Sequence, residues 1–273
     1  MNFIITGHRG LIGTFLKERL EKEGHTCKMT YDLRDGQDVR KLDKYKRKAN
    51  VLFHLAAFCK INETVLNPKL AFDNNVEGIY RVLEFCRKSD IKKIVFFSTS
   101  RNLSPEENPY TASKKYGEDL CEAYRQCYGI EYIIVRPSSV YAPFNDLTGR
   151  LLTNWCRAAC AGRELKIYGD ENKTLDFTHI DDFNDGIILL INNWEQNKNK
   201  AYDISGDRET YLIEVANLIN NYQPIKVSYY LPEVAQPQRV KVDISEMKKL
   251  GYKPKISIEE GIKQMMEFYK NGN

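Results

Sequence analysis

Short apolar runs alternate with longer amphipathic stretches along the first half of the chain. The run at 3–5 is Phe-Ile-Ile, and the stretch at 11–22 repeats apolar residues at helical spacing. Strands of a parallel sheet covered on both faces carry unbroken apolar runs, whereas surface helices carry a period near 3.6 residues. The pattern predicts strands at 3–5, 26–31, 51–57, 94–97 and 132–135, and helices at 11–22, 70–88 and 110–128.

Strands and helices in alternation predict the α/β class, with a Rossmann-type doubly wound parallel sheet. After about residue 141 the alternation loosens, and the predicted elements are helices at 151–161, 181–192, 209–220 and 258–269, strands at 165–168, 201–204 and 225–230, and a polar surface loop at 192–199. We therefore expect an NAD(P)-binding domain formed by residues 1–140 and about 177–204, and a smaller C-terminal substrate-binding lobe formed by residues of about 141–176 and 205–273.

Composition narrows the class of protein. The 273 residues include 41 basic and 37 acidic side chains, and this small excess, interleaved with acids, does not favour a nucleic-acid partner. No window holds 18 uninterrupted apolar residues and the segment 1–7 lacks the features of a signal peptide, so we expect a cytoplasmic protein with no membrane partner. The seven cysteines form no C-x-x-C pair and no zinc spacing, which predicts reduced, packed thiols and no metal site.

A glycine-rich turn follows the first predicted strand. It reads Gly7-His8-Arg9-Gly10-Leu11-Ile12-Gly13, a G-x-x-G-x-x-G pattern between a strand and a helix. Glycines permit a tight turn and a close approach of the backbone to a pyrophosphate, and the next helix directs its N-terminal amides at the phosphates. These seven residues are therefore predicted to bind a dinucleotide cofactor.

The type of coenzyme is left open between NAD and NADP. An acidic residue at the end of the second strand, Asp32, would bind the ribose hydroxyls and favour NAD. Arg9, inside the glycine turn, and Arg34 would instead bind a 2′-phosphate and favour NADP. Asp38 is a candidate contact for the adenine edge.

A Tyr-x-x-x-Lys pair, Tyr110 and Lys114, begins the predicted helix at 110–128. Residues four apart lie on one face of a helix. A free phenol has a pKa of about 10, and a neighbouring ammonium lowers that pKa, so the pair fits a proton donor and acceptor. Ser100 follows the strand at 94–97 and would hydrogen-bond the reacting oxygen, because hydroxyls at the carboxyl ends of parallel strands face the ligand crevice.

Further motifs follow one another as they do in a known family. They are His54-Leu55-Ala56-Ala57, Asn75, Phe97-Ser98-Thr99-Ser100, Arg136-Pro137 before Val140-Tyr141, Asp176-Phe177, Ile180-Asp181-Asp182 and Leu250-Gly251-Tyr252-Lys253-Pro254. Together with the glycine turn and the Tyr110–Lys114 pair, these motifs cover nearly the whole chain. The chain resembles an extended short-chain dehydrogenase/reductase of the NAD-dependent epimerase/dehydratase family, which contains nucleotide-sugar epimerases and 4-keto-sugar reductases.

The resemblance implies roles for individual residues. It implies Tyr110 as acid/base, Lys114 as its partner and ribose clamp, and Ser100 as the third catalytic residue. A homodimer built on the helices at 70–88 and 110–128 is implied as well. The cofactor contacts implied by the motifs are Leu55, Ala56, Ala57, Asn75, Ser98, Arg136 and Ser138. Substrate contacts are expected from Ser100, Arg101, Ser139 and Arg239, the last of which matches a pyrophosphate-binding arginine of the family.

Departures from the family pattern bear on the reaction. The two residues directly after Ser100 are Arg101 and Asn102 and not acids, which disfavours a dehydratase. Ser139 and Leu175 stand where the family has Asn and Arg. The resemblance implies an enzyme, an NAD(P)-dependent epimerase acting at C4 of a nucleotide sugar. The alternatives are an NADPH-dependent 4-keto-sugar reductase, favoured by Arg9 and the short interval from 100 to 110, and a catalytically weak NAD(P)-binding regulatory protein.

Overall fold

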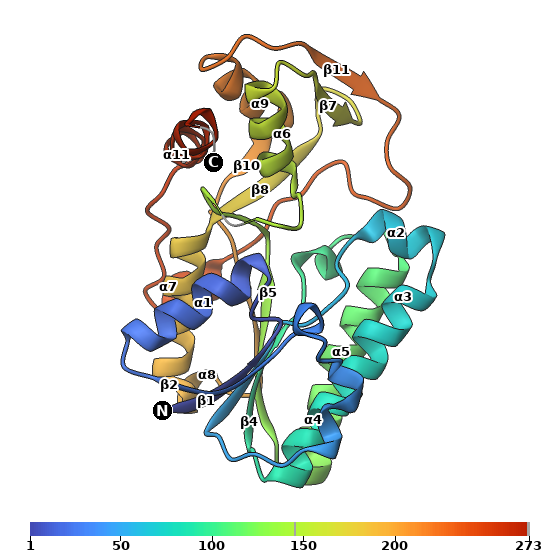
Figure 1. Ribbon diagram of the computed structural model, residues 1–273, viewed down its shortest axis with the longest axis vertical. Coiled ribbons are helices and arrows are strands. Elements are labelled where there is room, and N and C mark those ends of the chain that lie inside the picture. Colours follow the sequence, from blue (N-terminus) through green and yellow to red (C-terminus); the bar gives the residue numbers. More distant parts are fainter. Residues whose placement is uncertain (145, 272–273) are drawn as a thin grey trace.

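The computed structural model describes residues 1–144 and 146–271, and a six-stranded sheet forms the centre of its larger domain. All neighbouring strands of this sheet are parallel, and helices cover both faces (Figure 1), so the predicted Rossmann-type sheet is confirmed. The strand order is β2 (Thr26–Tyr31), β1 (Asn2–Thr6), β3 (Val51–His54), β4 (Lys93–Phe97), β5 (Glu131–Pro137) and β9 (Lys200–Ile204). One face carries α1 (Leu11–Lys22) and α7 (Ile180–Asn192), and the other carries α4 (Glu77–Ser89) and α5 (Pro109–Tyr128).

A smaller lobe stands beyond the carboxyl ends of these strands, at the top of Figure 1. Its two small sheets have the orders β10 (Glu209–Tyr211), β8 (Thr174–His179), β6 (Ser139–Tyr141), and β11 (Val227–Tyr230), β7 (Leu165–Tyr168). Its helices are α6 (Leu151–Cys160), α9 (Leu212–Asn220), α10 (Ser245–Lys249) and α11 (Ile258–Lys270). The strand β8 belongs to this lobe as far as His179, whereas the chain returns to the large sheet with α7 and β9.

Several local elements differ from the predicted ones. The predicted helix at 70–88 is divided into α3 (Lys69–Ala71), a π-helical turn (η3, Phe72–Val76) and α4. The polar loop expected at 192–199 contains a helical turn, α8 (Trp194–Asn197), because the Trp194 ring is buried and its Nε1 donates to Glu131 at 2.9 Å. The pattern also missed α2 (Ile61–Leu66) and the 3-10 turns η1 (Leu33–Asp35), η2 (Val39–Lys44) and η4 (Ser100–Leu103).

The order of the strands decides where a ligand can bind. The chain moves from β1 to β2 on one side and then to β3 on the other side of β1. At such a reversal the loops after neighbouring strands diverge and leave a crevice at their carboxyl ends. The glycine turn after β1 and the segment 55–57 after β3 both lie at this crevice, where the Leu55 amide donates to the Thr6 carbonyl at 3.1 Å.

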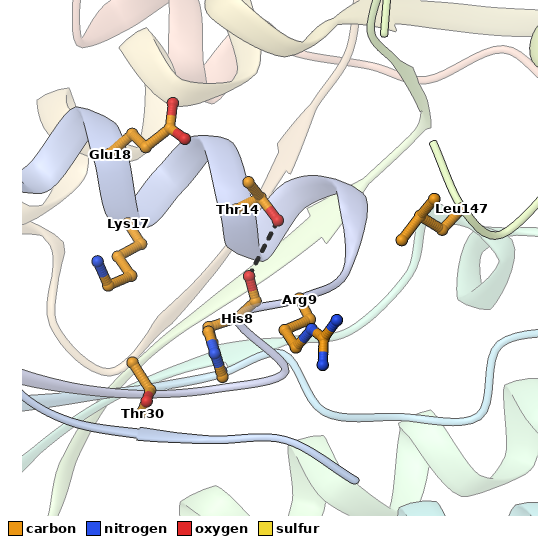
Figure 2. A pocket seen from close by; sticks show the side chains of 7 residues that line it. All are labelled: His8, Arg9, Thr14, Lys17, Glu18, Thr30 and Leu147. Carbon is orange, nitrogen blue, oxygen red and sulfur yellow. Dashed lines mark hydrogen bonds between the residues drawn. The ribbon is translucent and has the colours of Figure 1, made fainter. Parts of the chain in front are cut away.

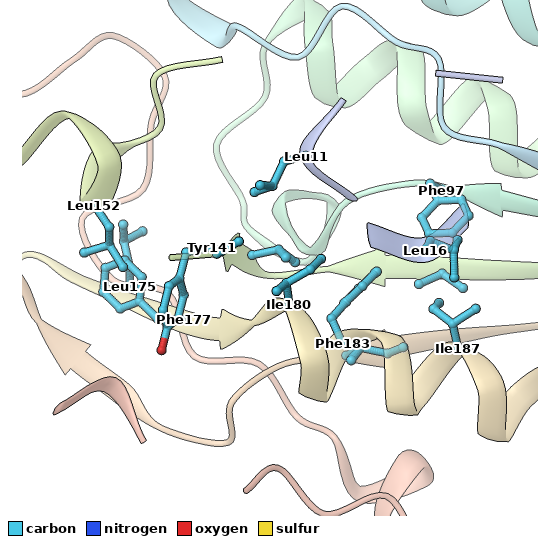
Figure 3. Close-up of a cluster of buried hydrophobic side chains, with 14 of the residues drawn as sticks. Leu11, Leu16, Phe97, Tyr141, Leu152, Leu175, Phe177, Ile180, Phe183 and Ile187 are labelled. Carbon is cyan, nitrogen blue, oxygen red and sulfur yellow. The ribbon is translucent and has the colours of Figure 1, made fainter. Parts of the chain in front are cut away.

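One apolar core joins the large domain to the lobe. It contains Leu16, Phe97 and Phe183 beside the large sheet, and Tyr141 and Phe177 in the lobe (Figure 3). A second cluster lies between the opposite face of the sheet and α4 and α5. Because the two units share the first core, packing fixes their relative position, and with it the walls of any cavity between them.

The part of the chain that the structure describes has neither a membrane-spanning helix nor a metal-binding cluster. None of its helices is long and apolar enough to cross a membrane. None of its groups of three or more His, Cys, Asp and Glu side chains is arranged to hold a metal ion.

Candidate functional site

The glycine turn has a shape that side chains would obstruct. Gly7 has a φ of 76°, and a Cβ there would lie 2.6 Å from the Ala56 amide nitrogen. A Cβ on Gly13 would lie 2.2 Å from the Gly7 carbonyl oxygen. The turn therefore brings the N-terminal amides of α1 close to the backbone of the 55–57 segment, a cradle that fits the pyrophosphate of a dinucleotide.

A ring of polar contacts ties this turn to the end of β2. The two carboxylate oxygens of Asp32 accept the backbone amides of Arg9 at 3.1 Å and Arg34 at 2.9 Å. The Arg9 guanidinium pairs with Asp35 at 2.7 Å, and the Arg34 guanidinium donates to the Arg9 carbonyl. Both arginines that would bind a 2′-phosphate are therefore already bonded within the protein.

A cavity of about 530 Å³ opens beside the turn. Figure 2 shows His8 and Arg9 projecting from the turn, with the Thr14 hydroxyl of α1 bonded to the His8 carbonyl at 3.0 Å. The His8 Nε2 lies 3.3 Å from an Asp35 oxygen. Asp38, the predicted adenine contact, instead binds the Arg40 side chain, with 2.7 Å between Oδ2 and Nη2.

The start of α5 fixes the Tyr110–Lys114 pair. The Asn108 side chain accepts the Thr111 amide at 3.0 Å, and Thr111 returns a bond to the Asn108 amide, so Pro109 begins the helix in a capping box. Tyr110 and Lys114 are 8% and 4% exposed. The Lys114 ammonium donates to the Phe97 carbonyl at 2.8 Å, which anchors it at the carboxyl end of β4.

Burial shifts both titrating groups of this pair toward their neutral forms. It is the largest cause of the lowered pKa of Lys114, which falls to about 8. It is also the largest cause of the raised pKa of Tyr110, and the charge of Cys59 adds to that rise. The Thr99 side chain and the cations Arg150 and Arg101 act in the opposite direction on the pKa of Tyr110.

The structure brings Thr99, rather than the predicted Ser100, to the phenol. Thr99 and Tyr110 line the same cavity. A hydrogen bond from the Thr99 side chain to the phenol lowers the pKa of Tyr110. Ser100 is 6% exposed, is outside the described cavity lining and is the first residue of η4. The two residues differ because Thr99 still has an extended backbone, whereas the chain turns into η4 at Ser100.

A second cavity, of about 700 Å³, lies between the carboxyl edge of the large sheet and the lobe. The glycine turn contributes Ile12 to its wall, and the large domain contributes Tyr110 and Thr99. Three of the other residues predicted from the sequence line it, namely Ser138, Ser139 and Arg101. Arg101, which an exposed loop would leave in solvent, is half-buried in this cavity wall instead, and its Nη1 atom is buried.

Asn75, Ser98 and Arg136 were predicted to contact the cofactor and are occupied by protein groups. The Asn75 amide bonds both backbone groups of Phe58 and the Ser113 hydroxyl, so it holds the segment after β3 against α5. The Ser98 hydroxyl donates to Glu118, whose carboxylate also binds the Arg136 guanidinium in a bidentate pair.

Arg239 was predicted to bind substrate, and the structure places it elsewhere. Its side chain is 64% exposed, pairs with Glu209 at 3.0 Å and is absent from the described cavity lining. The lining contains other charged groups that the sequence analysis did not single out. They are Lys60, Arg150, Lys166 and Lys173 among the cations, and Glu63 and Glu233 among the anions.

Cys59 is another residue that the sequence analysis missed. Cys86, Cys121 and Cys156 are buried, as expected for packed thiols. The expectation is wrong for three exposed cysteines, Cys127, Cys160 and Cys59, of which Cys59 lies in the wall of the second cavity. Its position directly after the segment 55–57 is the signal that places it at the crevice. The composition argument alone could not distinguish it from the packed cysteines.

Comparisons with known proteins agree with this geometry. A putative UDP-glucose 4-epimerase of Methanocaldococcus jannaschii is 29% identical, with 99% of each chain covered. A UDP-glucuronate 4-epimerase of Thermodesulfobacterium geofontis is 27% identical over 98% of this chain and 96% of its own. The solved UDP-glucose 4-epimerase of Thermus thermophilus, a complex with NAD, superposes with a TM-score of 0.90 at 21% identity over the whole of both chains. The family model "NAD dependent epimerase/dehydratase family" matches residues 3–205, and the chain belongs to that family.

Proposed function

We propose that the chain is an NAD-dependent epimerase that inverts C4 of a UDP-linked sugar. The observation that carries this proposal is the buried Tyr110–Lys114 pair at the wall of a cavity that also reaches Ile12 of the glycine turn. With the pyrophosphate of a dinucleotide on the turn, its nicotinamide would extend towards this cavity and a sugar bound there beside the phenol. The relatives named for 4-epimerisation of UDP-sugars support the choice of reaction.

The side chains supply proton transfer and positioning. Tyr110 takes the proton of the C4 hydroxyl and later returns it, and the Thr99 hydroxyl holds the sugar oxygen beside the phenol. Lys114, fixed on the Phe97 carbonyl, supplies positive charge that favours the phenolate. NAD, which the glycine turn and Asp32 would hold, would supply reversible acceptance of the C4 hydride. Loss and return of one hydride and one proton leave only the configuration changed.

The contacts around the glycine turn support NAD over NADP. Asp32 places a carboxylate at the end of β2, where the ribose hydroxyls of the adenosine half bind in this fold. Arg9 is held by Asp35, so it is not free for a 2′-phosphate. The same pairing removes the argument by which Arg9 favoured a reductase.

The charges of the second cavity support a substrate with phosphates. Besides Arg101, four cations, Lys60, Arg150, Lys166 and Lys173, line it, against two acidic residues. This excess of cations suits a nucleotide diphosphate without a contribution from Arg239. The predicted homodimer and cytoplasmic location belong to this proposal, and exposed aromatic residues on the helical face at α4 and α5 support the dimer. These residues are Phe72, Tyr80 and Tyr116, with exposed fractions of 58%, 40% and 40%.

The experiment that tests the proposal combines coenzyme analysis with product analysis. Mass spectrometry of the purified protein should find retained NAD(H), and NMR should show interconversion of a gluco and a galacto UDP-sugar without added coenzyme. Stoichiometric consumption of NADPH with a 4-keto sugar would instead establish the reductase. Binding of neither coenzyme would contradict both.

A further inference from the structure

Arg101 lies on the second residue of η4, the turn that follows β4. The Thr99 hydroxyl accepts the Arg101 amide at 3.2 Å and fixes the start of this turn. Thr99, Arg101 and Tyr110 line the second cavity together. The guanidinium is therefore at the same end of the cavity as the phenol, and the charge of Arg101 lowers the pKa of Tyr110.

The Arg101 guanidinium has no ionic partner in the protein. No carboxylate lies within salt-bridge distance of it in the part of the chain that the structure describes, and its Nη1 atom is buried without a hydrogen-bond partner. Arginines elsewhere differ, since Arg136 is paired with Glu118 and Arg40 with Asp38. A buried cation without an anion is costly, and burial lowers the pKa of Arg101. The anion that pairs with the Arg101 guanidinium would then come from the ligand.

Glu233, an acidic residue of the cavity lining, is bonded to other side chains. It accepts hydrogen bonds from Asn62 and from Gln236, the latter at 3.0 Å. Gln236 also donates to Asn62 at 2.7 Å, so the three side chains bond one another. Glu233 and Glu106 therefore contribute a favourable field at Arg101 without forming a direct pair with it.

We propose that Arg101 binds an anionic group on the reacting sugar itself, a carboxylate or a phosphate carried by C6. This inference rests on the proposed function, because it takes the C4 hydroxyl to be at Tyr110. C1, which carries the nucleotide diphosphate, lies across the ring from C4, whereas C6 is attached to the carbon next to C4. An arginine beside the phenol is therefore closer to the substituents of C3 and C5 than to the diphosphate, and in a sugar acid the C6 group on C5 is the one that is anionic. A planar guanidinium binds either oxyanion in a bidentate manner.

The names of the relatives do not make this choice. They include enzymes for a neutral sugar and for a sugar acid, UDP-glucose and UDP-glucuronate. Arg101 favours the second kind of substrate by its charge. It also distinguishes this chain from a site built to hold a neutral hydroxymethyl group, which would leave the guanidinium unpaired.

The test is calorimetric binding to the full-length, NAD-loaded protein, with UDP-glucose, UDP-glucuronate and glucose 6-phosphate as probes. The wild type should bind UDP-glucuronate at least tenfold more tightly than UDP-glucose. Arg101→Gln should remove that preference while changing the affinity for UDP-glucose less than threefold. Arg101→Lys keeps the charge but not the planar guanidinium, so its preference for UDP-glucuronate should lie between those of the wild type and Arg101→Gln. The control is Arg163→Gln, an exposed arginine outside the described cavity lining.

Each outcome decides the inference. Equal affinity of the wild type for the neutral and the acidic UDP-sugar would overturn it, as would an equal loss of both in Arg101→Gln. Tight binding of glucose 6-phosphate that depends on Arg101 would assign the anion to a phosphate. If UDP-sugars do not bind at all, the proposed function is wrong, and the glucose 6-phosphate titration alone then decides whether Arg101 binds sugar anions. If Arg101→Gln does not fold, the wild-type preference and Arg101→Lys provide the decision.

Discussion

The charged groups of the glycine turn and those of the substrate cavity are satisfied in opposite ways. At the turn, Asp32 accepts two backbone amides and the Arg9 guanidinium is paired with Asp35, although Nδ1 of His8 is buried without a partner among the described residues. At the cavity and in the lobe strand β8, buried polar atoms lack partners. They include Arg101 Nη1, Asp176 Oδ2 and Tyr141 Oη.

The difference teaches where a ligand is needed to complete the structure. A turn whose charged side chains already pair with the protein presents mainly backbone amides, which suits a coenzyme that stays bound through many turnovers. A cavity with unpaired buried groups gains its partners only when substrate arrives, and its charge then decides which substrate is bound. Substitutions at the turn, in the cavity and in the lobe test this difference.

Gly13→Ala is expected to have the largest effect. Its Cβ would lie 2.2 Å from the Gly7 carbonyl oxygen, so the turn must open and the amide cradle is lost. Overpacking of this kind costs about 1–3 kcal/mol. We expect NAD to be absent from the purified variant and turnover to disappear, as measured by mass spectrometry and a coupled assay. Gly78→Ala in α4 is the control, because its Cβ would meet only Val39 at 3.4 Å. Retention of NAD by Gly13→Ala would show that the cradle adapts.

Tyr110→Phe should lower kcat by about 10²–10⁴-fold while NAD stays bound, because the proton donor and acceptor is removed from an intact cavity. Steady-state kinetics with a UDP-sugar and coenzyme analysis of the same sample provide the measurement. Tyr124→Phe is matched to it, since Tyr124 lies in the same helix and its hydroxyl binds Glu84 at 2.9 Å away from the cavity. Full turnover by Tyr110→Phe would leave the chain as a coenzyme-binding protein whose chemistry does not use this tyrosine.

The turn could be predicted from the sequence because its signal is local. Seven consecutive residues between a strand and a helix specify both the shape and the backbone groups of the cradle. The Tyr110–Lys114 pair is local in the same sense, since four residues on one helix fix their common face. The large sheet followed from the alternation of apolar runs, which is also a short-range pattern.

The rest of the site depends on contacts between distant segments, which a pattern of residues does not record. Arg239 matches a family motif, yet β10 places Glu209 beside it and draws it away from the cavity. Cys59 reaches the cavity only because β3 ends next to β1. The choice between Ser100 and Thr99 depends on where the chain after β4 turns from an extended backbone into η4, which the motif does not record.

Asp176→Asn should weaken the pH dependence of stability. Burial raises the pKa of the Asp176 carboxyl from 3.8 to about 7. The folded state therefore holds a proton that the unfolded state releases, so stability is fully present below about pH 4 and is lost as the pH rises to about 7. The variant removes this loss, which amounts to a few kcal/mol at 1.36 kcal/mol per pKa unit.

Urea unfolding of both proteins at pH 4.5 and pH 7.5 checks the prediction, and the variant should show the smaller decline. A residual decline is expected from Asp203, whose pKa burial raises to about 6. Identical declines in the two proteins would mean that Asp176 is ionised in the folded state and that its unpaired Oδ2 has found a partner.

Arg239→Gln should have the smallest effect, and it tests the contrast at its weakest point. Because Arg239 is exposed and bound to Glu209 outside the cavity lining, the KM for a UDP-sugar should change less than threefold and kcat should not change. Arg150→Gln provides the comparison, since Arg150 lines the cavity and should raise the same KM at least tenfold if it binds the diphosphate. A tenfold rise in KM for Arg239→Gln would show that the arginine leaves Glu209 for the substrate. In that event the family motif describes the liganded enzyme, and the lobe completes its diphosphate site only when the nucleotide sugar binds.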